Sequence, residues 1–310
     1  MQFLYWLENL RIPMLNELML LITHLGEETA FLAIAIVVFW CVDKYEGYYM
    51  MAVGLFGNLV NQFMKILFRI PRPWVKDPNF HALEAAIPEA GGYSFPSGHS
   101  QTAVGTFGCI AASQKNKIIR LICIAVMVLV PFSRMYVGVH TPADVLVGSA
   151  MALIMVFAFR PLMLGNRKKN IPYVFLGMLV LGVAFLVYVL RFAPRGHIAV
   201  MTEDFVNLQS AQKNAYTFLG CFAALPIVYW VDEKKLHFET KAIWWAQILK
   251  AALGLGLVLA VKSGTKSVLE ALIGHEFIAR AVRYFLVVMV AGILWPMTFK
   301  WFSKLGRKEK

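Results

Sequence analysis

The chain has 310 residues, of which 59% are hydrophobic and only 15% are charged. A soluble domain usually carries about 25% charged residues, so this composition excludes an ordinary soluble domain and indicates a polytopic membrane protein. The net charge of +12 does not favour nucleic-acid binding, because the basic residues lie in short clusters between apolar runs, as in the loops of membrane proteins.

The predicted elements are all helices. Residues 3–24 mix aromatic and apolar side chains with charged ones, which predicts an interfacial amphipathic helix. No basic region or small-residue cleavage site stands at the start, so we expect no cleavable signal peptide. Nine apolar segments follow, at about residues 28–42, 48–70, 98–113, 118–136, 142–160, 171–192, 213–231, 243–262 and 277–300. We therefore expect an all-α polytopic membrane bundle of about nine transmembrane helices, although several segments fall short of the roughly 20 residues that cross a bilayer.

A basic stretch at residues 165–170, GNRKKN, divides the chain into two regions. Residues 1–165 contain every polar motif that we find. Residues 166–310 form an additional region of four predicted membrane helices with no recognisable role. The four cysteines all lie inside apolar runs, so they predict neither a disulfide framework nor a metal site.

The basic residues of the connecting segments are distributed unequally between the two faces of the predicted bundle. We count 16 on the face that contains residues 165–170 and 9 on the opposite face, which also holds Lys65, Arg72 and Arg134. The positive-inside rule predicts that the first face is cytoplasmic and that the second face is outside.

Three separated segments with unusual polar residues converge on that second face. They are KILFRIPRP at the end of the second span, FPSGHS at the start of the third, and SRMYVGVHTPAD between the fourth and fifth. In chain order they supply Lys65, Arg72, Ser97, Gly98, His99, Arg134, His140 and Asp144. Lysine and arginine neutralise phosphate oxygens, and a helix that begins at Ser97-Gly98 presents backbone N–H groups to an anion. The set therefore predicts a phosphate site.

The spacing of the last segment assigns roles to the histidines. Thr141-Pro142 predicts a helix cap followed by a first-turn proline, which places Asp144 within reach of His140. A carboxylate that orients an imidazole makes it a better nucleophile. We therefore predict that His140 attacks phosphorus, that Asp144 orients it, and that His99 protonates the leaving oxygen. We expect the other histidines to be solvated or otherwise satisfied; these are His24, His81, His197, His237 and His275.

Together the three segments resemble the signature of the type 2 phosphatidic acid phosphatase family, whose active site is shared with vanadium haloperoxidases. The first part of that signature is a lysine followed after six residues by Arg-Pro, and the second part is Pro-Ser-Gly-His. The third part is Ser-Arg, then five residues, a histidine, three residues and an aspartate. This chain has every position of the signature between Lys65 and Asp144. The resemblance implies a metal-independent membrane phosphatase with its catalytic core in residues 1–165, no cofactor, and a phosphohistidine intermediate on a lipid phosphate substrate. It assigns phosphate binding to Lys65, Arg72, Ser97, Gly98 and Arg134, and catalysis to His99, His140 and Asp144.

Three functions are compatible with these motifs. The first is hydrolysis of a lipid phosphomonoester or diphosphate, such as an isoprenyl diphosphate, phosphatidylglycerol phosphate, phosphatidic acid or a sphingoid base phosphate. The second is transfer of the phosphoryl group to another hydroxyl. The third is a phospholipid transporter or flippase, which the two histidines argue against because binding alone needs only the cations. We expect a multi-pass protein of a bacterial cytoplasmic membrane with its active site on the extracytoplasmic face.

An insert of 22 residues, from Trp74 to Phe95, separates the first two segments of the signature. We expect it to shape the entrance to the site. Its centre, with Trp74, Leu83 and Ile87, predicts either an amphipathic surface on the lipid or a plain exposed loop.

Overall fold

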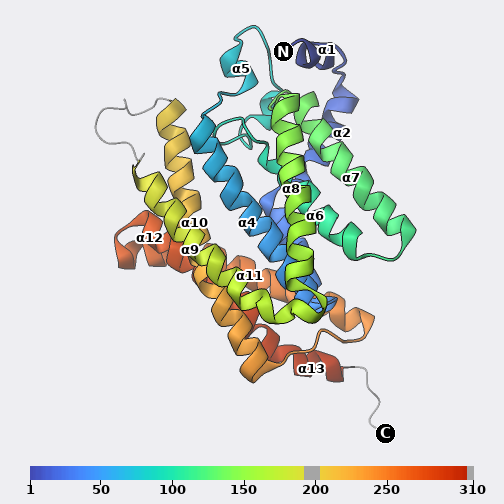
Figure 1. Cartoon of the computed structure of the whole chain (residues 1–310), viewed down its shortest axis with the longest axis vertical. Helices are drawn as coiled ribbons and strands as arrows, with labels where there is room; N and C mark the ends of the chain where they lie inside the picture. The colour runs from blue at the N-terminus through green and yellow to red at the C-terminus, as the bar shows by residue number, and fades with distance from the viewer. Residues whose placement is uncertain (192–202, 306–310) are drawn as a thin grey trace. The chain divides into compact units, whose positions relative to one another are not determined.

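The computed structural model describes residues 1–191 and 203–305, so the predicted surface histidine His197 lies outside the described residues. Within them the regular structure is helical and contains no strand. The α-helices are α1 (Gln2–Asn9), α2 (Pro13–His24), α3 (Glu28–Cys41), α4 (Lys44–Phe68), α5 (Pro73–Lys76), α6 (Gly98–Ser113), α7 (Lys117–Tyr136), α8 (Pro142–Met163), α9 (Ile171–Arg191), α10 (Glu203–Val231), α11 (Trp244–Ile273), α12 (Glu276–Met289) and α13 (Phe299–Lys304) (Figure 1). Shorter 3₁₀ and π segments are η1 (Glu84–Ala86), η2 (Gly165–Asn170), η3 (Asp232–Leu236), η4 (Val290–Leu294) and η5 (Pro296–Thr298).

The expectation of an all-α polytopic membrane protein is confirmed, and the described chain holds seven or eight candidate spans against the expected number of about nine. Seven helical segments of the described chain are long and apolar enough to cross a membrane, and the pair α2 and α3, bent by 48°, is an eighth candidate. The predicted span at 98–113 is α6, whose 16 residues are shorter than a bilayer requires. The predicted span at 28–42 is α3, which is a candidate span only together with α2. The helix α2 is therefore a candidate half of a broken span and not simply an interfacial helix.

The described chain forms two compact units. The first contains Met1–Leu32, Met50–Arg160 and the described residues of α10 up to Ala211. In this unit α7 packs against α1, α2 and α6 (Figure 1). A buried apolar cluster joins α1, α2, the insert and the end of α7; its members are Leu7, Met19, Ala86, Ala90, Tyr136, Val137 and Val139.

The insert packs onto this cluster. This position differs from both expectations for the insert, an amphipathic surface on the lipid and a plain exposed loop. Trp74 and Leu83 are partly buried against the cluster, and Phe80 is 1% exposed. Only Ile87 of the three predicted surface residues is exposed. The burial of this apolar area stabilises the position of the insert over the end of α7, because each apolar side chain removed from water contributes about 1.5–3 kcal/mol.

The second unit contains Ala33–Tyr49, Pro161–Arg191 and the rest of the described chain from Gln212. In it α11 and α12 pack together. Gly274 ends α11 in the left-handed region with φ of 69°, a conformation that glycine adopts without steric cost. The ion pair between Lys44 Nζ and the buried carboxylate of Asp232, at 2.8 Å, links α4 to η3 within this unit.

Candidate active site

The start of α6 forms one wall of the site. Ser97 is the N-cap residue, and its hydroxyl oxygen accepts from the backbone N–H of Ser100 at 3.4 Å and from the Ser100 hydroxyl at 2.9 Å. The backbone N–H of Ser97 donates to the backbone oxygen of Asp144 at 2.9 Å. A Cβ on Gly148 would lie 2.5 Å from the Ser97 backbone oxygen, so only glycine allows α8 to approach α6 this closely.

The start of α8 is capped reciprocally by Thr141 and Asp144. The Thr141 N–H donates to Asp144 Oδ2 at 2.8 Å, and the Asp144 N–H donates to the Thr141 hydroxyl at 3.4 Å. The same Oδ2 accepts from the Ser94 hydroxyl at 2.6 Å and lies 3.5 Å from His140 Nδ1. Two donors thus fix the carboxylate in front of the imidazole, where it can hold the proton on Nδ1.

The other ring nitrogen of His140 faces a guanidinium group. Arg72 Nη1 lies 3.0 Å from His140 Nε2 and donates to the Val139 backbone oxygen at 3.0 Å. The backbone oxygens of Gly92 and Gly91 accept from Arg72 Nε and Nη2 at 3.0 and 2.9 Å. His140 and Arg72 are only 1% and 3% exposed, so Nε2 is directed at a buried cation instead of at solvent.

Two further basic side chains are buried close to His140. Lys65 is 6% exposed, and its Nζ donates to the Gly91 backbone oxygen at 3.4 Å. Arg134 is fully buried, and its Nη1 donates to the Thr23 hydroxyl at 2.7 Å. Arg134 Nε and Nη2 are buried and have no hydrogen-bond partner in the described chain. Buried donors are rarely left unpaired, and a guanidinium edge with two N–H groups matches a phosphate in geometry and charge.

His99 lies next to these cations. Its Nε2 is buried without a hydrogen-bond partner among the described residues, and the charges of Arg134 and His140 act on its ring. A Cβ on Gly26 would lie 2.8 Å from the His99 backbone oxygen, so the break between α2 and α3 packs directly against this residue. His99 therefore has a ring nitrogen available for a ligand.

The environment of His140 favours its neutral form. Burial lowers the pKa of His140 well below its usual value, and the positive charges of Arg72, Arg134 and Lys65 lower the pKa further, while a hydrogen bond with the Ser94 backbone opposes them. A neutral imidazole with its Nδ1 proton held by a carboxylate has a lone pair on Nε2, which is the form that can attack phosphorus.

The structure places all eight predicted site residues in the first unit, at the starts of α6 and α8, the ends of α4 and α7, and the segments that follow α4 and α7. Arg72, Arg134, Lys65, His99 and His140 are close enough for their charges to interact. The Ser97 hydroxyl, in contrast, is bonded within its own cap by Ser100. Gly98 opens α6, and a Cβ there would meet only Asn61 Oδ1, at 3.8 Å.

Sequence reasoning missed four residues that hold the site together: Thr23, Ser94, Gly91 and Gly92. The Gly91-Gly92 pair is a turn signal in the sequence, and Gly92 does have a φ of 74°. Thr23 and Ser94 stand in no motif, so nothing in the sequence marked them.

The fold and the site define a class: a helical membrane protein whose buried site brings two histidines and a carboxylate close to three basic side chains. Comparison with known proteins agrees. Residues 46–169 match the PAP2 superfamily, and residues 216–308 match the PAP2 superfamily phosphatase transmembrane extension. The chain belongs to the PAP2 superfamily of membrane phosphatases, which are hydrolases of phosphoric esters.

Three curated relatives are lipid phosphate phosphatases by name. Phosphatidylglycerophosphatase B of Bacillus subtilis (strain 168) is 31% identical over 163 residues, which are 48% of this chain and 75% of that protein. Undecaprenyl-diphosphatase BcrC of the same organism is 34% identical over 106 residues, 34% of this chain and 52% of that protein. Sphingosine-1-phosphate phosphatase 1 of Mus musculus is 24% identical over 267 residues, 79% of this chain and 58% of that protein. No solved structure matches the chain significantly.

Proposed function

We propose that this protein hydrolyses a lipid phosphomonoester or diphosphate through a phosphohistidine on His140. The observation that carries the proposal is the position of His140: its Nδ1 is 3.5 Å from the carboxylate of Asp144, and its Nε2 is 3.0 Å from a guanidinium nitrogen of Arg72. A phosphate bound by Arg72 would therefore present its phosphorus to Nε2.

The reaction would proceed in two displacements. His140 Nε2 would form a bond to phosphorus while the bond to the leaving oxygen breaks, and His99 would give that oxygen a proton. His99 would then take a proton from water, whose oxygen would attack phosphorus and break the phosphorus–nitrogen bond. Lys65, Arg72 and Arg134 would stabilise the negative charge of the transferring group in both steps, and the backbone N–H groups at Ser97-Gly98 would support them.

The setting of the site supports a lipid substrate. The site residues lie at the ends of helices of an integral membrane protein, and the curated relatives are named for lipid phosphates. We propose that residues 1–165 form the catalytic core, and that the site opens on the extracytoplasmic face of a bacterial cytoplasmic membrane, as the distribution of basic residues predicts.

The test is phosphate release by the purified full-length protein from a panel of lipid phosphates. The panel should hold an isoprenyl diphosphate, phosphatidylglycerol phosphate, phosphatidic acid and a sphingoid base phosphate, and His140→Ala is the control. We expect activity on at least one lipid, persistence in excess chelator, and inhibition by vanadate, which mimics five-coordinate phosphorus. Activity that disappears in chelator and returns with magnesium would overturn the proposed chemistry.

A further inference from the structure

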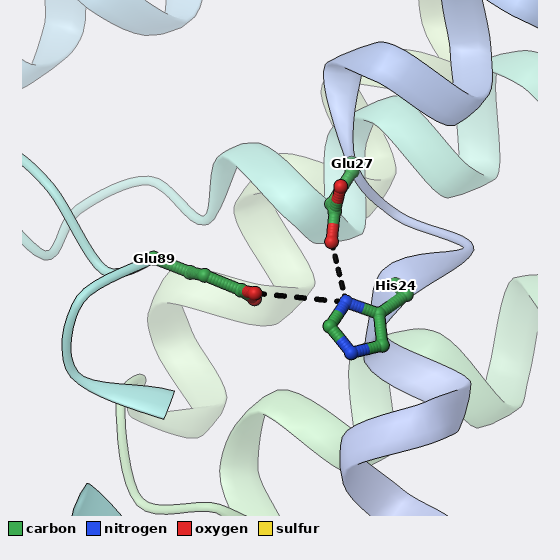
Figure 2. A group of neighbouring side chains, drawn as sticks. All are labelled: His24, Glu27 and Glu89. Atoms are coloured by element: carbon green, nitrogen blue, oxygen red, sulfur yellow. Dashed lines mark hydrogen bonds and ion pairs between the residues drawn. The ribbon is translucent and has the colours of Figure 1, made fainter. Parts of the chain in front are cut away.

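Outside the catalytic set, three potential metal ligands from two separate segments of the chain converge. His24 ends α2, Glu27 lies in the break between α2 and α3, and Glu89 lies in the insert. One ligand atom from each of the three residues lies within 4.8 Å of the other two, which is the only such group of three or more in the described chain. Figure 2 shows both carboxylates directed at the same nitrogen of the His24 ring.

The distances describe a hydrogen bond between His24 and Glu27, with Glu89 at the spacing of a further ligand. His24 Nδ1 lies 2.5 Å from Glu27 Oε1 and 3.6 Å from Glu89 Oε1. A single ring nitrogen carries one proton, so it can donate to only one of the two carboxylates. Ligand atoms that bind a tetrahedral Zn²⁺ at 2.0–2.2 Å are about 3.3–3.5 Å apart, so an ion fits after the Glu27 contact opens by roughly 1 Å.

The chemistry of the three ligands selects the ion. An imidazole with two carboxylates suits Zn²⁺ and related transition-metal ions, whereas Ca²⁺ and Mg²⁺ prefer sites made of oxygen alone. His24 and Glu89 are exposed and Glu27 is half-buried, so an ion can enter from solution. Three protein ligands would leave the fourth position to water.

The group also joins the two segments that hold the catalytic cations. The break between α2 and α3 follows Thr23, the partner of Arg134, and it contains Gly26, which packs against His99. The insert supplies the backbone oxygens that hold Arg72. The negative charges of Glu27 and Glu89 act on Arg134, so a cation between them would also reduce their pull on this guanidinium.

We propose that His24, Glu27 and Glu89 bind one divalent ion of the Zn²⁺ type, which fastens the insert to the break between α2 and α3. This site is separate from the chemistry proposed for His140. It does not depend on that chemistry, because the ligands are not among the residues that contact phosphate.

Zinc binding by the full-length protein tests the proposal. The protein should be purified in detergent with a tag free of histidine, stripped with chelator, dialysed, and titrated with Zn²⁺ in a calorimeter. We expect one Zn²⁺ per chain and a higher melting temperature with the ion bound. Removing a residue that only hydrogen-bonds to a metal ligand lowers metal affinity roughly 10–100-fold. Because His24 and Glu89 would be ligands themselves, His24→Gln and Glu89→Gln should each weaken Zn²⁺ binding by at least about tenfold.

Two matched controls lie in the same insert. Glu84 is an exposed carboxylate, and His81 is an exposed histidine whose Nδ1 lies 3.4 Å from Glu8 Oε1. Glu84→Gln and His81→Gln should bind Zn²⁺ as the unchanged protein does. Absence of saturable binding in the unchanged protein, or equal binding by Glu89→Gln, would overturn the proposal irrespective of any phosphatase activity.

Discussion

The hydroxyl of Thr23, at the end of α2, accepts a hydrogen bond of 2.7 Å from Nη1 of Arg134, at the end of α7. The two residues are 111 positions apart, and both are fully buried. The bond fixes one side of the guanidinium and leaves Nε and Nη2 without a protein partner in the described chain. Thr23 is therefore a positioning residue for the cation that would bind the phosphate.

Thr23→Val keeps the shape of the side chain and removes this acceptor. A hydrogen bond to a charged group contributes roughly 1.5–3 kcal/mol, so kcat/KM should fall roughly 10–100-fold. The loss should appear mainly as a higher KM and as weaker competitive inhibition by inorganic phosphate, because Arg134 would bind phosphate. Thr23→Ser should restore most of the loss. Thr106→Val is the control, because Thr106 is also buried and its hydroxyl donates to the Thr102 backbone oxygen within α6. An equal loss there would contradict a positioning role.

The roles proposed for His140 and His99 predict different responses to substitution. His140→Ala should abolish turnover of every substrate, because no covalent intermediate can form. His99→Ala should cost about 10²–10⁴-fold on a lipid phosphate, and relatively less on p-nitrophenyl phosphate, whose leaving group needs no proton. The turnover of Asp144→Asn should lie between those of His140→Ala and His99→Ala.

Rapid quenching with a radiolabelled substrate checks the roles directly. The His99→Ala protein should accumulate label on His140. Label trapped on His99, or substantial turnover by His140→Ala, would reverse or refute the assignment.

The close approach of α8 to α6 should not tolerate a side chain at Gly148. A Cβ there would lie 2.5 Å from the Ser97 backbone oxygen, so Gly148→Ala must move the start of α6. Overpacking of this kind costs typically about 1–3 kcal/mol, and the melting temperature and kcat/KM should both fall. Gly177, in α9, has no atom within 4 Å of a built Cβ, so Gly177→Ala should be neutral or slightly stabilising. Equal effects at the two positions would contradict the packing.

Stability should depend on pH through His140. Burial and the adjacent cations lower the pKa of His140, so the unfolded chain takes up a proton near pH ~6.5 while the folded chain stays neutral there. Below about pH 6.5 the unfolded state therefore binds more protons, and the free energy of unfolding decreases as pH falls.

Melting temperatures at about pH 7.5 and 5.5 measure this effect. The decrease should be smaller in His140→Gln than in the unchanged protein, whereas His81→Gln, at an exposed site, should follow the unchanged protein. Parallel behaviour of all three proteins would show that His140 titrates normally.

The sidedness of the membrane protein can be tested with single cysteines. In a cysteine-free background, an impermeant thiol reagent added to intact cells should label Asn79→Cys, in the insert, and should spare Lys169→Cys, in η2. Both positions are exposed, so a difference in labelling reports the side of the membrane. The reverse pattern would place the active site in the cytoplasm.

The sequence by itself determined the class of the protein and predicted the residue types of its site. The composition and the apolar runs indicate segments that cross a bilayer. These segments are helices, because an α-helix satisfies its own backbone hydrogen bonds and the bilayer core offers no other partner. The reciprocal cap of Thr141 and Asp144 could also be predicted, because its partners are three residues apart and helix geometry alone brings them together.

Only the tertiary structure decided what surrounds that site. The partner of Arg134 comes from α2, the oxygens that hold Arg72 come from the insert, and Ser94 reaches Asp144 across 50 positions. In the cluster of His24, Glu27 and Glu89 the first two residues are only three positions apart, but the packing of the insert alone brings Glu89 to them. These long-range contacts depend on how the helices and the insert pack. Packing is set by the complementarity of many side chains at once, so no local pattern in the sequence encodes a long-range contact.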